Sequence, residues 1–250
     1  MNHAFRCLVV IPVYNHGTAV ARLVQRLCEQ SQDCLLVDDG SEPGCASVLD
    51  HLAASHPTQV RLLRLSHNQG KGAAVMAGLR EAGRLGYSHA LQIDADGQHA
   101  VDDVPAFIAE AAAHSKAVIC GCPVYDASVP KGRLYGRYLT HVWVWINTLS
   151  FEIRDSMCGF RVYPLAPTLE LLDSTRIGKR MDFDSEIIVR LHWRGVPVRN
   201  RPTRVVYPED GVSHFDVWRD NVRISRMHAR LFFGMVLRLP RLLLQKWRRR

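Results

Sequence analysis

The sequence Asp94-Ala95-Asp96 places two carboxylates one residue apart, directly after an apolar run that ends at Ile93. Mg²⁺ and Mn²⁺ prefer oxygen donors of this kind. A divalent ion held there could bind a diphosphate group and neutralise the charge that this group gains when it leaves. A single pair of this kind is more often a solvated turn. A metal-binding role for Asp94 and Asp96 therefore requires other ligand-binding residues from the neighbouring elements.

Short apolar runs alternate with helical spacing through the first half of the chain. The runs that predict strands lie at residues 7–12, 34–37, 60–65, 90–93 and 117–121. The segments with helical periodicity lie at residues 20–32, 48–54, 73–85 and 101–113. Strands that alternate with helices of this length predict βα units and a largely parallel sheet.

Candidate site residues stand at the end of each of the first four predicted strands or in the loop after it. They are Pro12, Tyr14 and Asn15 for the first strand, Asp38 and Asp39 for the second, Lys71 for the third, and Asp94 and Asp96 for the fourth. The carboxyl ends of parallel strands face one crevice, so we expect these residues to form one site. An aspartate after the second strand suits a ribose or base, and Lys71 between two glycines suits a phosphate or base. Taken singly, the aspartates could be a plain turn and Lys71 a solvated helix start.

The alternation breaks after Gly121. Residues 123–136 are basic and loop-like, and residues 138–151 are apolar and aromatic. A loop entering a strand is expected at 155–163, an amphipathic helix at 182–193 and a strand at 196–207. The tail, residues 215–250, is helical in pattern and mixes apolar with basic residues.

The bulk composition is that of a globular protein with anionic partners. The chain has 250 residues and a net charge of +8, which suits nucleic acid, phospholipid or phosphorylated substrates. The seven cysteines form no C-x-x-C pair, which favours reduced thiols in the cytosol. We expect no signal peptide, and no apolar run reaches the roughly 18 residues that a membrane span requires.

Six motifs together resemble the family 2 glycosyltransferases, which have the GT-A fold. They are I-P-V-Y-N (11–15), V-D-D-G-S (37–41), N-Q-G-K-G-A-A (68–74), D-A-D-G-Q-H (94–99), D-S-M-C-G-F-R-V-Y (155–163) and F-D-S-E (183–186). The last two are similar to the branch that contains dolichol-phosphate mannose synthase and bacterial polyprenyl-phosphate glycosyltransferases. The resemblance covers residues 7–213. It implies an α/β, GT-A-like domain over residues 1–214, with a mostly parallel central sheet flanked by helices. Residues 215–250 would form a C-terminal amphipathic helix.

The resemblance also implies a nucleotide-diphosphate sugar donor and inversion by direct displacement. The implied nucleotide contacts are Pro12, Tyr14, Asn15, Asp38, Asp39, Lys71 and Asp94. The implied Mg²⁺ or Mn²⁺ ligands are Asp94, Asp96 and Gln98. Asp155 matches an acidic position near the acceptor, so Asp155 and Asp96 are the candidate catalytic residues. Asp155 could equally be a helix or loop cap.

The candidates for binding an acceptor phosphate are Lys131, Arg133, Arg137 and Arg161, and the alternative is an ordinary basic surface. Two arginines that relatives often carry have no match. Cys122-Pro123 stands at one position, and Pro208-Glu-Asp210 precedes Gly211-Val-Ser213 at the other. Arg204 or His214 could substitute. Glu186 could support the acceptor loop, or could belong to the acidic face of an exposed helix.

The tail interleaves apolar and basic residues, which is typical of a helix that lies on anionic lipid; the alternative is a helix docked on the sheet.

Taken together, the motifs and the tail predict a metal-dependent inverting glycosyltransferase, peripheral on the cytoplasmic face of the membrane, with a lipid-linked, polyprenyl-phosphate-like acceptor. One alternative is a soluble or non-phosphate lipid acceptor with Asp155 as base. Another is a non-catalytic module that binds anionic lipid or nucleic acid. Asp94 and Asp96 argue against nucleic acid, because carboxylates repel its backbone. The sugar, the nucleotide and the oligomeric state stay open.

Overall fold

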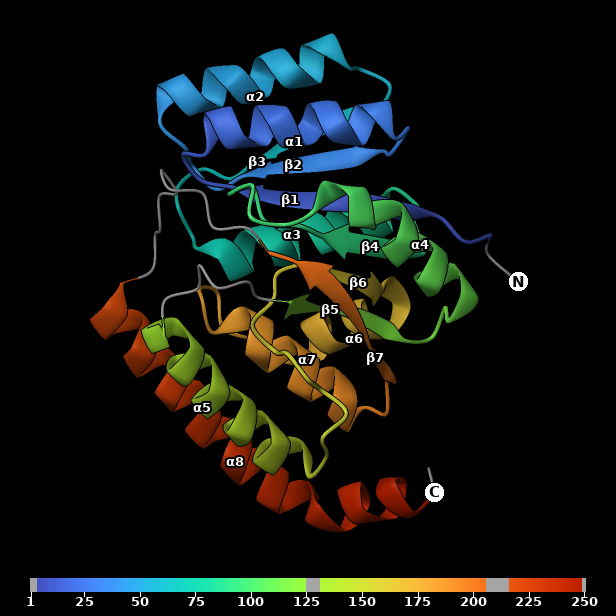
Figure 1. Cartoon of the computed structure of the whole chain (residues 1–250), viewed down its shortest axis with the longest axis vertical. Helices are drawn as coiled ribbons and strands as arrows, with labels where there is room; N and C mark the ends of the chain where they lie inside the picture. Colours follow the sequence, from blue (N-terminus) through green and yellow to red (C-terminus); the bar gives the residue numbers. More distant parts are fainter. Residues whose placement is uncertain (1–3, 125–130, 206–215, 249–250) are drawn as a thin grey trace.

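A seven-stranded sheet forms the centre of the molecule (Figure 1). The computed structural model describes residues 4–124, 131–205 and 216–248. The strands are β1 (Cys7–Val13), β2 (Cys34–Asp38), β3 (Val60–Arg64), β4 (His89–Gln92), β5 (Val118–Val124), β6 (Arg161–Pro164) and β7 (Val198–Arg204). Their order is β3-β2-β1-β4-β6-β5-β7. Of the seven strands that the structure describes, only β6 runs antiparallel to its neighbours, β4 and β5. The predicted mostly parallel sheet flanked by helices is confirmed.

Helices cover both faces of the sheet. One face carries α1 (Gly17–Glu29), α2 (Pro43–Ser55), the short 3₁₀ helix η1 (Val101–Asp103) and α4 (Val104–Ala113). The other face carries α3 (Lys71–Arg84), α6 (Leu165–Ser174) and α7 (Phe183–Trp193), with α5 (Lys131–Thr148) and α8 (Val217–Arg248) outside them. Alternate side chains of β1 supply the two cores, because a strand points successive residues to opposite faces. Val9 and Ile11 enter one core, and Leu8 and Val10 enter the other.

Helix α3 lies very close to the sheet, and Gly78 permits this approach. A Cβ atom at Gly78 would stand 2.3 Å from a methyl carbon of Val10 on β1. Any larger residue would push the helix away from the strands. The close packing matters for function because α3 begins at Lys71, and the helix position sets where that side chain lies.

Helix α7 differs from its prediction. The segment 182–193 was expected to be amphipathic, but ten of the eleven residues of α7 are buried. The helix contacts α3 and α6 on the side of the sheet, and α5 and α8 cover it from outside. Its acidic residues, Asp184 and Glu186, therefore lie in the interior. Burial of a carboxylate requires partners, and both residues have them.

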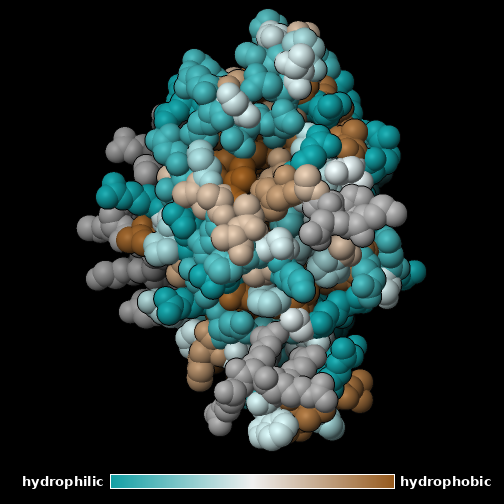
Figure 2. Space-filling view, turned by 90° about the vertical axis from the view of Figure 1, so that its right-hand side faces the viewer, coloured by the Kyte–Doolittle hydropathy of each residue, from teal (hydrophilic) through white to brown (hydrophobic). Residues whose placement is uncertain are grey.

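Helix α8 docks along α5 and α7 through an apolar side (Figure 1). Met227, Leu231, Met235 and Leu242 are buried there. The helix is therefore docked on the protein, but its partners in the described part of the chain are two helices and not the sheet that the alternative named. The opposite side of the helix keeps large apolar residues exposed. Within the described ranges, no helix has both the length and the hydropathy that crossing a bilayer demands. The face of the molecule shown in Figure 2 is largely hydrophilic, and its hydrophobic residues form small groups.

Candidate active site

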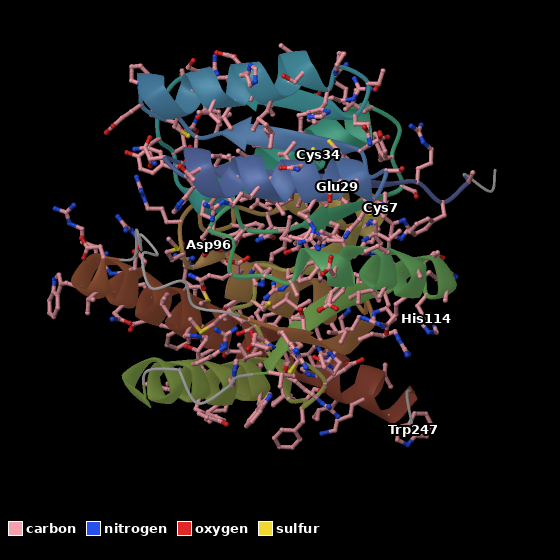
Figure 3. The ribbon with its side chains drawn as sticks, turned by 45° about the horizontal axis from the view of Figure 1, so that its top comes forward. Cys7, Glu29, Cys34, Asp96, His114 and Trp247 are labelled. Atoms are coloured by element: carbon pink, nitrogen blue, oxygen red, sulfur yellow. The ribbon has the colours of Figure 1, made fainter. Side chains whose placement is uncertain are left out.

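The carboxyl ends of β1, β2 and β4 and the start of α3 come together at one edge of the sheet. In Figure 3, Asp96 lies at the opposite end of the sheet from Cys7, where β1 begins. The centre of this edge is Lys71. Its Nζ donates to Asp94 Oδ2 at 2.7 Å, and it lies 2.8 Å from Asp184 Oδ2. Burial opposes the charge of this ammonium group, but the two carboxylates outweigh burial and hold the pKa of Lys71 above its usual value.

Asp184 is a site residue that the sequence analysis missed. It lies in the first turn of α7 and is buried. Its Oδ1 accepts a hydrogen bond from Gln92 Nε2 at 3.0 Å, so it links β4 to the lysine. The sequence signal for Asp184 is its place in the F-D-S-E motif, two residues before Glu186. The pairing with Lys71 joins residues that are far apart in the sequence.

Asp94 keeps one oxygen without a partner. Its Oδ1 is buried and has no hydrogen-bond partner among the described residues. Burial raises the pKa of Asp94, but the charges of Lys71 and His99 outweigh burial and lower it, so the carboxylate is ionised. Space for this group depends on Gly159, since a Cβ atom there would stand 2.2 Å from Asp94 Oδ2. An ionised oxygen with no partner is available to a ligand.

Asp96 lies close to Asp94 but has different hydrogen-bond partners and an opposite pKa shift. Its Oδ1 accepts a hydrogen bond from the backbone N–H of Gln98 at 3.0 Å. Burial and the charge of Asp94 raise the pKa of Asp96. Across the described parts of the chain, no group of three or more His, Cys, Asp or Glu side chains could hold a metal ion by itself. Two carboxylates with an unpartnered oxygen still fit Mg²⁺, which proteins often bind through one or two carboxylates plus the phosphates of a substrate.

Asp38 and Asp39 bind protein groups in this structure. Asp38 accepts from Arg64 Nε at 2.8 Å and from the N–H of Ser41 at 2.8 Å. Asp39 accepts from the backbone N–H groups of Gln69 and Gly70, at 2.7 and 2.8 Å. Burial raises the pKa of Asp39, against the lowering effect of these hydrogen bonds. Asp39 thus ties the end of β2 to the loop that presents Lys71.

The predicted residues after β1 form part of the same loop system. Pro12 lies within β1, opposite Val37 of β2, and is buried. Tyr14 and Asn15 are half-buried at the edge. Asn15 adopts a left-handed conformation with φ 57°, which asparagine tolerates better than most residues. Its side-chain oxygen accepts from the N–H of Glu42 at 2.8 Å, which fixes the β1 loop to the β2 loop.

Asp155 lies beside α5 and is almost fully engaged. Its carboxylate accepts from Arg137 Nε at 2.6 Å and Nη2 at 2.8 Å, and from the backbone N–H groups of Met157 and Cys158, both at 2.8 Å. His141 Nε2 lies 3.5 Å away. Burial raises the pKa of Asp155, but its hydrogen bond with His141 and the charge of Arg137 outweigh burial and lower it. This geometry is that of a loop cap which also anchors α5, and a carboxylate of low pKa is a weak base.

The four residues predicted for the acceptor phosphate have different positions. Arg137 is bound to Asp155, and the side chains of Lys131 and Arg133 lie outside the described residues. Arg161 is fully buried in β6, where its Nη1 and Nη2 donate to the backbone carbonyls of Asp184 and Ser156. It holds the first turn of α7 through the Asp184 carbonyl and is inaccessible to an acceptor at the surface.

Glu186 is buried, so the exposed-helix interpretation of this residue is wrong. It accepts from the N–H of Gly178 at 2.9 Å, from Arg190 Nε and Nη2, and from Arg230 Nη2 at 3.1 Å. It fixes the loop before α7 through Gly178; that this loop contacts an acceptor stays a prediction. Of the two proposed substitutes for the missing arginines, Arg204 is exposed at the end of β7, and His214 lies outside the described residues.

Comparison with known proteins gives one consistent family. The Glycosyl transferase family 2 model matches residues 8–169. The chain is 30% identical to polyprenol monophosphomannose synthase of Mycolicibacterium smegmatis, covering 83% of this chain and 80% of that protein. It is 28% identical to undecaprenyl-phosphate mannosyltransferase of Micrococcus luteus, covering 83% and 86%.

Solved structures with the same fold agree. Glucosyl-3-phosphoglycerate synthase of Mycobacterium tuberculosis, crystallised with Mn²⁺ and UDP-glucose, superposes with a TM-score of 0.66 at 12% identity, covering 93% of this chain and 79% of that one. TarS of S. aureus with UDP-GlcNAc gives 0.58 at 14% identity, covering 91% and 66%. Identities this low show the fold alone. Taken with the family match over most of the chain, they show that this protein belongs to the family 2 glycosyltransferases and has the GT-A fold.

Proposed function

We propose that the enzyme transfers a sugar from a nucleotide-diphosphate sugar to a polyprenyl-phosphate-like acceptor, with inversion at the anomeric carbon. The observation that carries this proposal is the arrangement at the sheet edge. Lys71 is held by Asp184 and by Asp94, the first carboxylate of the D-x-D sequence, and Asp94 Oδ1 has no hydrogen-bond partner in the part of the chain that the structure describes. Two further facts support it. Relatives of this chain are named for lipid-phosphate acceptors, and structural neighbours were crystallised with UDP-sugars.

The donor would lie across the ends of β1, β2 and β4. Tyr14 and Asn15 border the nucleoside end, and Lys71 and Asp94 lie toward the diphosphate. When bound, Mg²⁺ or Mn²⁺ at Asp94 and Asp96, with Gln98 beside them, would neutralise charge on the departing diphosphate. Asp38 and Asp39 act here mainly by fixing the loops that shape the pocket, since their oxygens already accept hydrogen bonds from the protein.

The proposed transfer needs no strong base. An acceptor phosphate is already an anion at neutral pH, so one of its oxygens attacks the anomeric carbon directly. The bond from that carbon to the diphosphate breaks, and the nucleoside diphosphate leaves from the opposite side. Positioning and charge stabilisation would carry most of the rate. The lowered pKa of Asp155 favours this acceptor over a hydroxyl acceptor, which would require that carboxylate to remove a proton.

The acceptor would approach from the side of α5, where Asp155 holds Arg137.

Helix α8, which packs on α5, would attach the enzyme to the cytoplasmic face of a membrane by lying on its surface. Phe233, Leu237 and Trp247 of α8 are 67, 83 and 76% exposed, and Trp247 points away from the body of the molecule (Figure 3). Replacing Phe233 and Leu237 by serine is expected to weaken binding to anionic vesicles while leaving thermal stability unchanged, because neither side chain is part of the core. Equal binding by this variant would refute the attachment.

The experiment that tests the donor site is calorimetric titration of nucleoside diphosphates, with and without Mn²⁺. The variants are Asp96→Asn and, as a matched control, Asp173→Asn, whose carboxylate lies on the surface at α6. Metal-dependent binding of one nucleotide that Asp96→Asn abolishes and the control retains would support the proposal. Binding of no nucleotide by the folded protein would leave a non-catalytic lipid-binding module as the better explanation.

A second experiment tests the acceptor. The matching sugar nucleotide is incubated with a polyprenyl phosphate and, separately, with the corresponding free polyprenol. We expect product from the phosphate alone, with the stereochemistry at the anomeric carbon inverted. Glycosylation of the free alcohol, lost in Asp155→Asn, would instead support the hydroxyl acceptor with Asp155 as base.

A further inference from the structure

A cavity of about 410 Å³ lies between α6, α7 and α8, away from the candidate active site. Its lining includes four arginines and a single acidic residue; these are Arg190, Arg194, Arg238, Arg241 and Glu170. Trp193 forms part of its wall. Asp184, which contacts Lys71, stands at the other end of α7, and Trp193 is about 14 Å from it along the helix axis. The cavity is therefore a separate feature of the fold.

Two of the four arginines form ion pairs with carboxylates of the protein. Arg190 donates twice to Glu186 Oε1, at 2.9 and 2.7 Å. Arg194 donates to Glu170 Oε1 at 2.8 Å and also to the hydroxyl of Ser174. These contacts hold both guanidinium groups in fixed positions at the α6 and α7 side of the cavity.

The two arginines of α8 have no such compensation. Among the described residues, no carboxylate lies within ion-pair distance of Arg238 or Arg241. Arg238 donates to the carbonyl of Gly234, and its guanidinium carbon stands 5.0 Å from the centre of the Trp193 ring, so the group is packed against the cavity wall. Arginine stays protonated at all physiological pH values. Two positive charges of the cavity are thus left without a counter-charge from the described part of the protein.

We propose that this cavity binds a phosphate group. A phosphate carries one or two negative charges, which match the two uncompensated guanidinium groups, and arginine binds phosphate oxygens through paired N–H donors. The headgroup of an anionic phospholipid and a soluble phosphate share this chemistry. The neighbouring surface of α8 carries Leu237 and Leu244, which are 83 and 49% exposed. An anionic lipid could therefore place its phosphate in the cavity with its chains beside α8.

The test compares two variants that remove the same charge from the same helix. The cavity variant is the double substitution Arg238→Gln and Arg241→Gln, which removes both uncompensated positive charges from the cavity. The control is the double substitution Arg219→Gln and Arg226→Gln, because neither residue lines the cavity. Each full-length protein is titrated with inorganic phosphate in a thermal-shift experiment. Each is also floated with vesicles of phosphatidylcholine, with and without phosphatidylglycerol.

We expect inorganic phosphate to raise the melting temperature of the wild type and the control, because a ligand that binds only the folded state stabilises it. The cavity variant should not respond. If the source is a lipid headgroup, the cavity variant should also lose roughly 25-fold in affinity for phosphatidylglycerol vesicles, from about 1 kcal/mol per arginine, and the control should lose clearly less. A phosphate response without this difference on vesicles would identify a soluble phosphate as the ligand.

The proposal would be overturned if the cavity variant and the control lost the same affinity for vesicles and showed the same melting-temperature response to phosphate. Vesicle binding would then be explained by the overall positive charge of the tail. Arg241→Gln alone guards against a folding defect, because no described residue forms an ion pair with this side chain. The readouts are binding and melting temperature, so they do not depend on donor binding or transfer. A failure here therefore leaves the proposed function standing.

Discussion

Replacing Lys71 by methionine should destabilise the fold strongly, because this lysine separates the buried carboxylate of Asp184 from the half-buried carboxylate of Asp94. Asp94 Oδ2 and Asp184 Oδ2 both lie within 2.8 Å of its Nζ, so the two oxygens are at most about 5.5 Å apart. At an effective dielectric constant of about 20, two unit charges at that distance repel by about 3 kcal/mol. Loss of one partner from a buried ion pair typically costs about 3–5 kcal/mol. We therefore expect Lys71→Met to lower the free energy of unfolding by about 3–5 kcal/mol.

The assay is urea denaturation of four proteins: wild type, Lys71→Met, Asp184→Asn and the double variant. Asp184→Asn in the Lys71→Met background should recover about 3 kcal/mol, since it removes the repulsion. Asp184→Asn alone should destabilise, because Lys71 then loses one of its two counter-charges. Lys116→Met, at an exposed position, is the control and should change stability by less than about 0.5 kcal/mol. The reasoning is refuted if Lys71→Met costs less than about 1 kcal/mol, or if the second substitution destabilises further instead of rescuing.

Three further outcomes follow from contacts in the structure. Gly159→Ala should displace Asp94 and weaken nucleotide binding by more than tenfold in calorimetry, whereas Gly136→Ala, which meets no atom within 4 Å, should bind normally. Asp155→Asn should cost about 2–4 kcal/mol in chemical denaturation, because it removes the buried charge to which the half-buried Arg137 donates two hydrogen bonds; unchanged stability with lost transfer would favour a base instead. Burial lowers the pKa of His228 to about 4, so the unfolded chain binds more protons between about pH 6.5 and 4. Stability should fall as the pH drops through that window, by up to about 3 kcal/mol, and His228→Gln should flatten this loss in urea titrations at several pH values.

The strands of the first half were predictable because their signal is local. A buried parallel strand needs a short run of apolar residues whatever surrounds it, and the runs at 7–12, 34–37, 60–65 and 90–93 each became a strand. The convergence of Lys71 and Asp94 also followed from the sequence, since parallel strands end at a common edge. The family resemblance, carried by six motifs in order, was confirmed by the family match over residues 8–169.

The second half was less predictable, because its arrangement depends on packing between distant segments. Nothing local indicates that β6 inserts between β4 and β5 in the antiparallel direction. The polarity of residues 182–193 suggested an exposed face, but α5 and α8 cover α7 and bury it. Helix α6, at Leu165–Ser174, was not predicted at all.

The sequence by itself determined the family, the parallel core and the chemistry available at the edge of the sheet, because each is written in short motifs and local periodicity. Only the tertiary structure decided how those groups are paired. It gave Lys71 a second carboxylate from Asp184, it bound Asp155 to Arg137, and it placed Arg161 in the interior. Each of these pairings depends on where a helix or strand from a distant part of the chain packs, and the free energy that fixes it comes from burial summed over many residues.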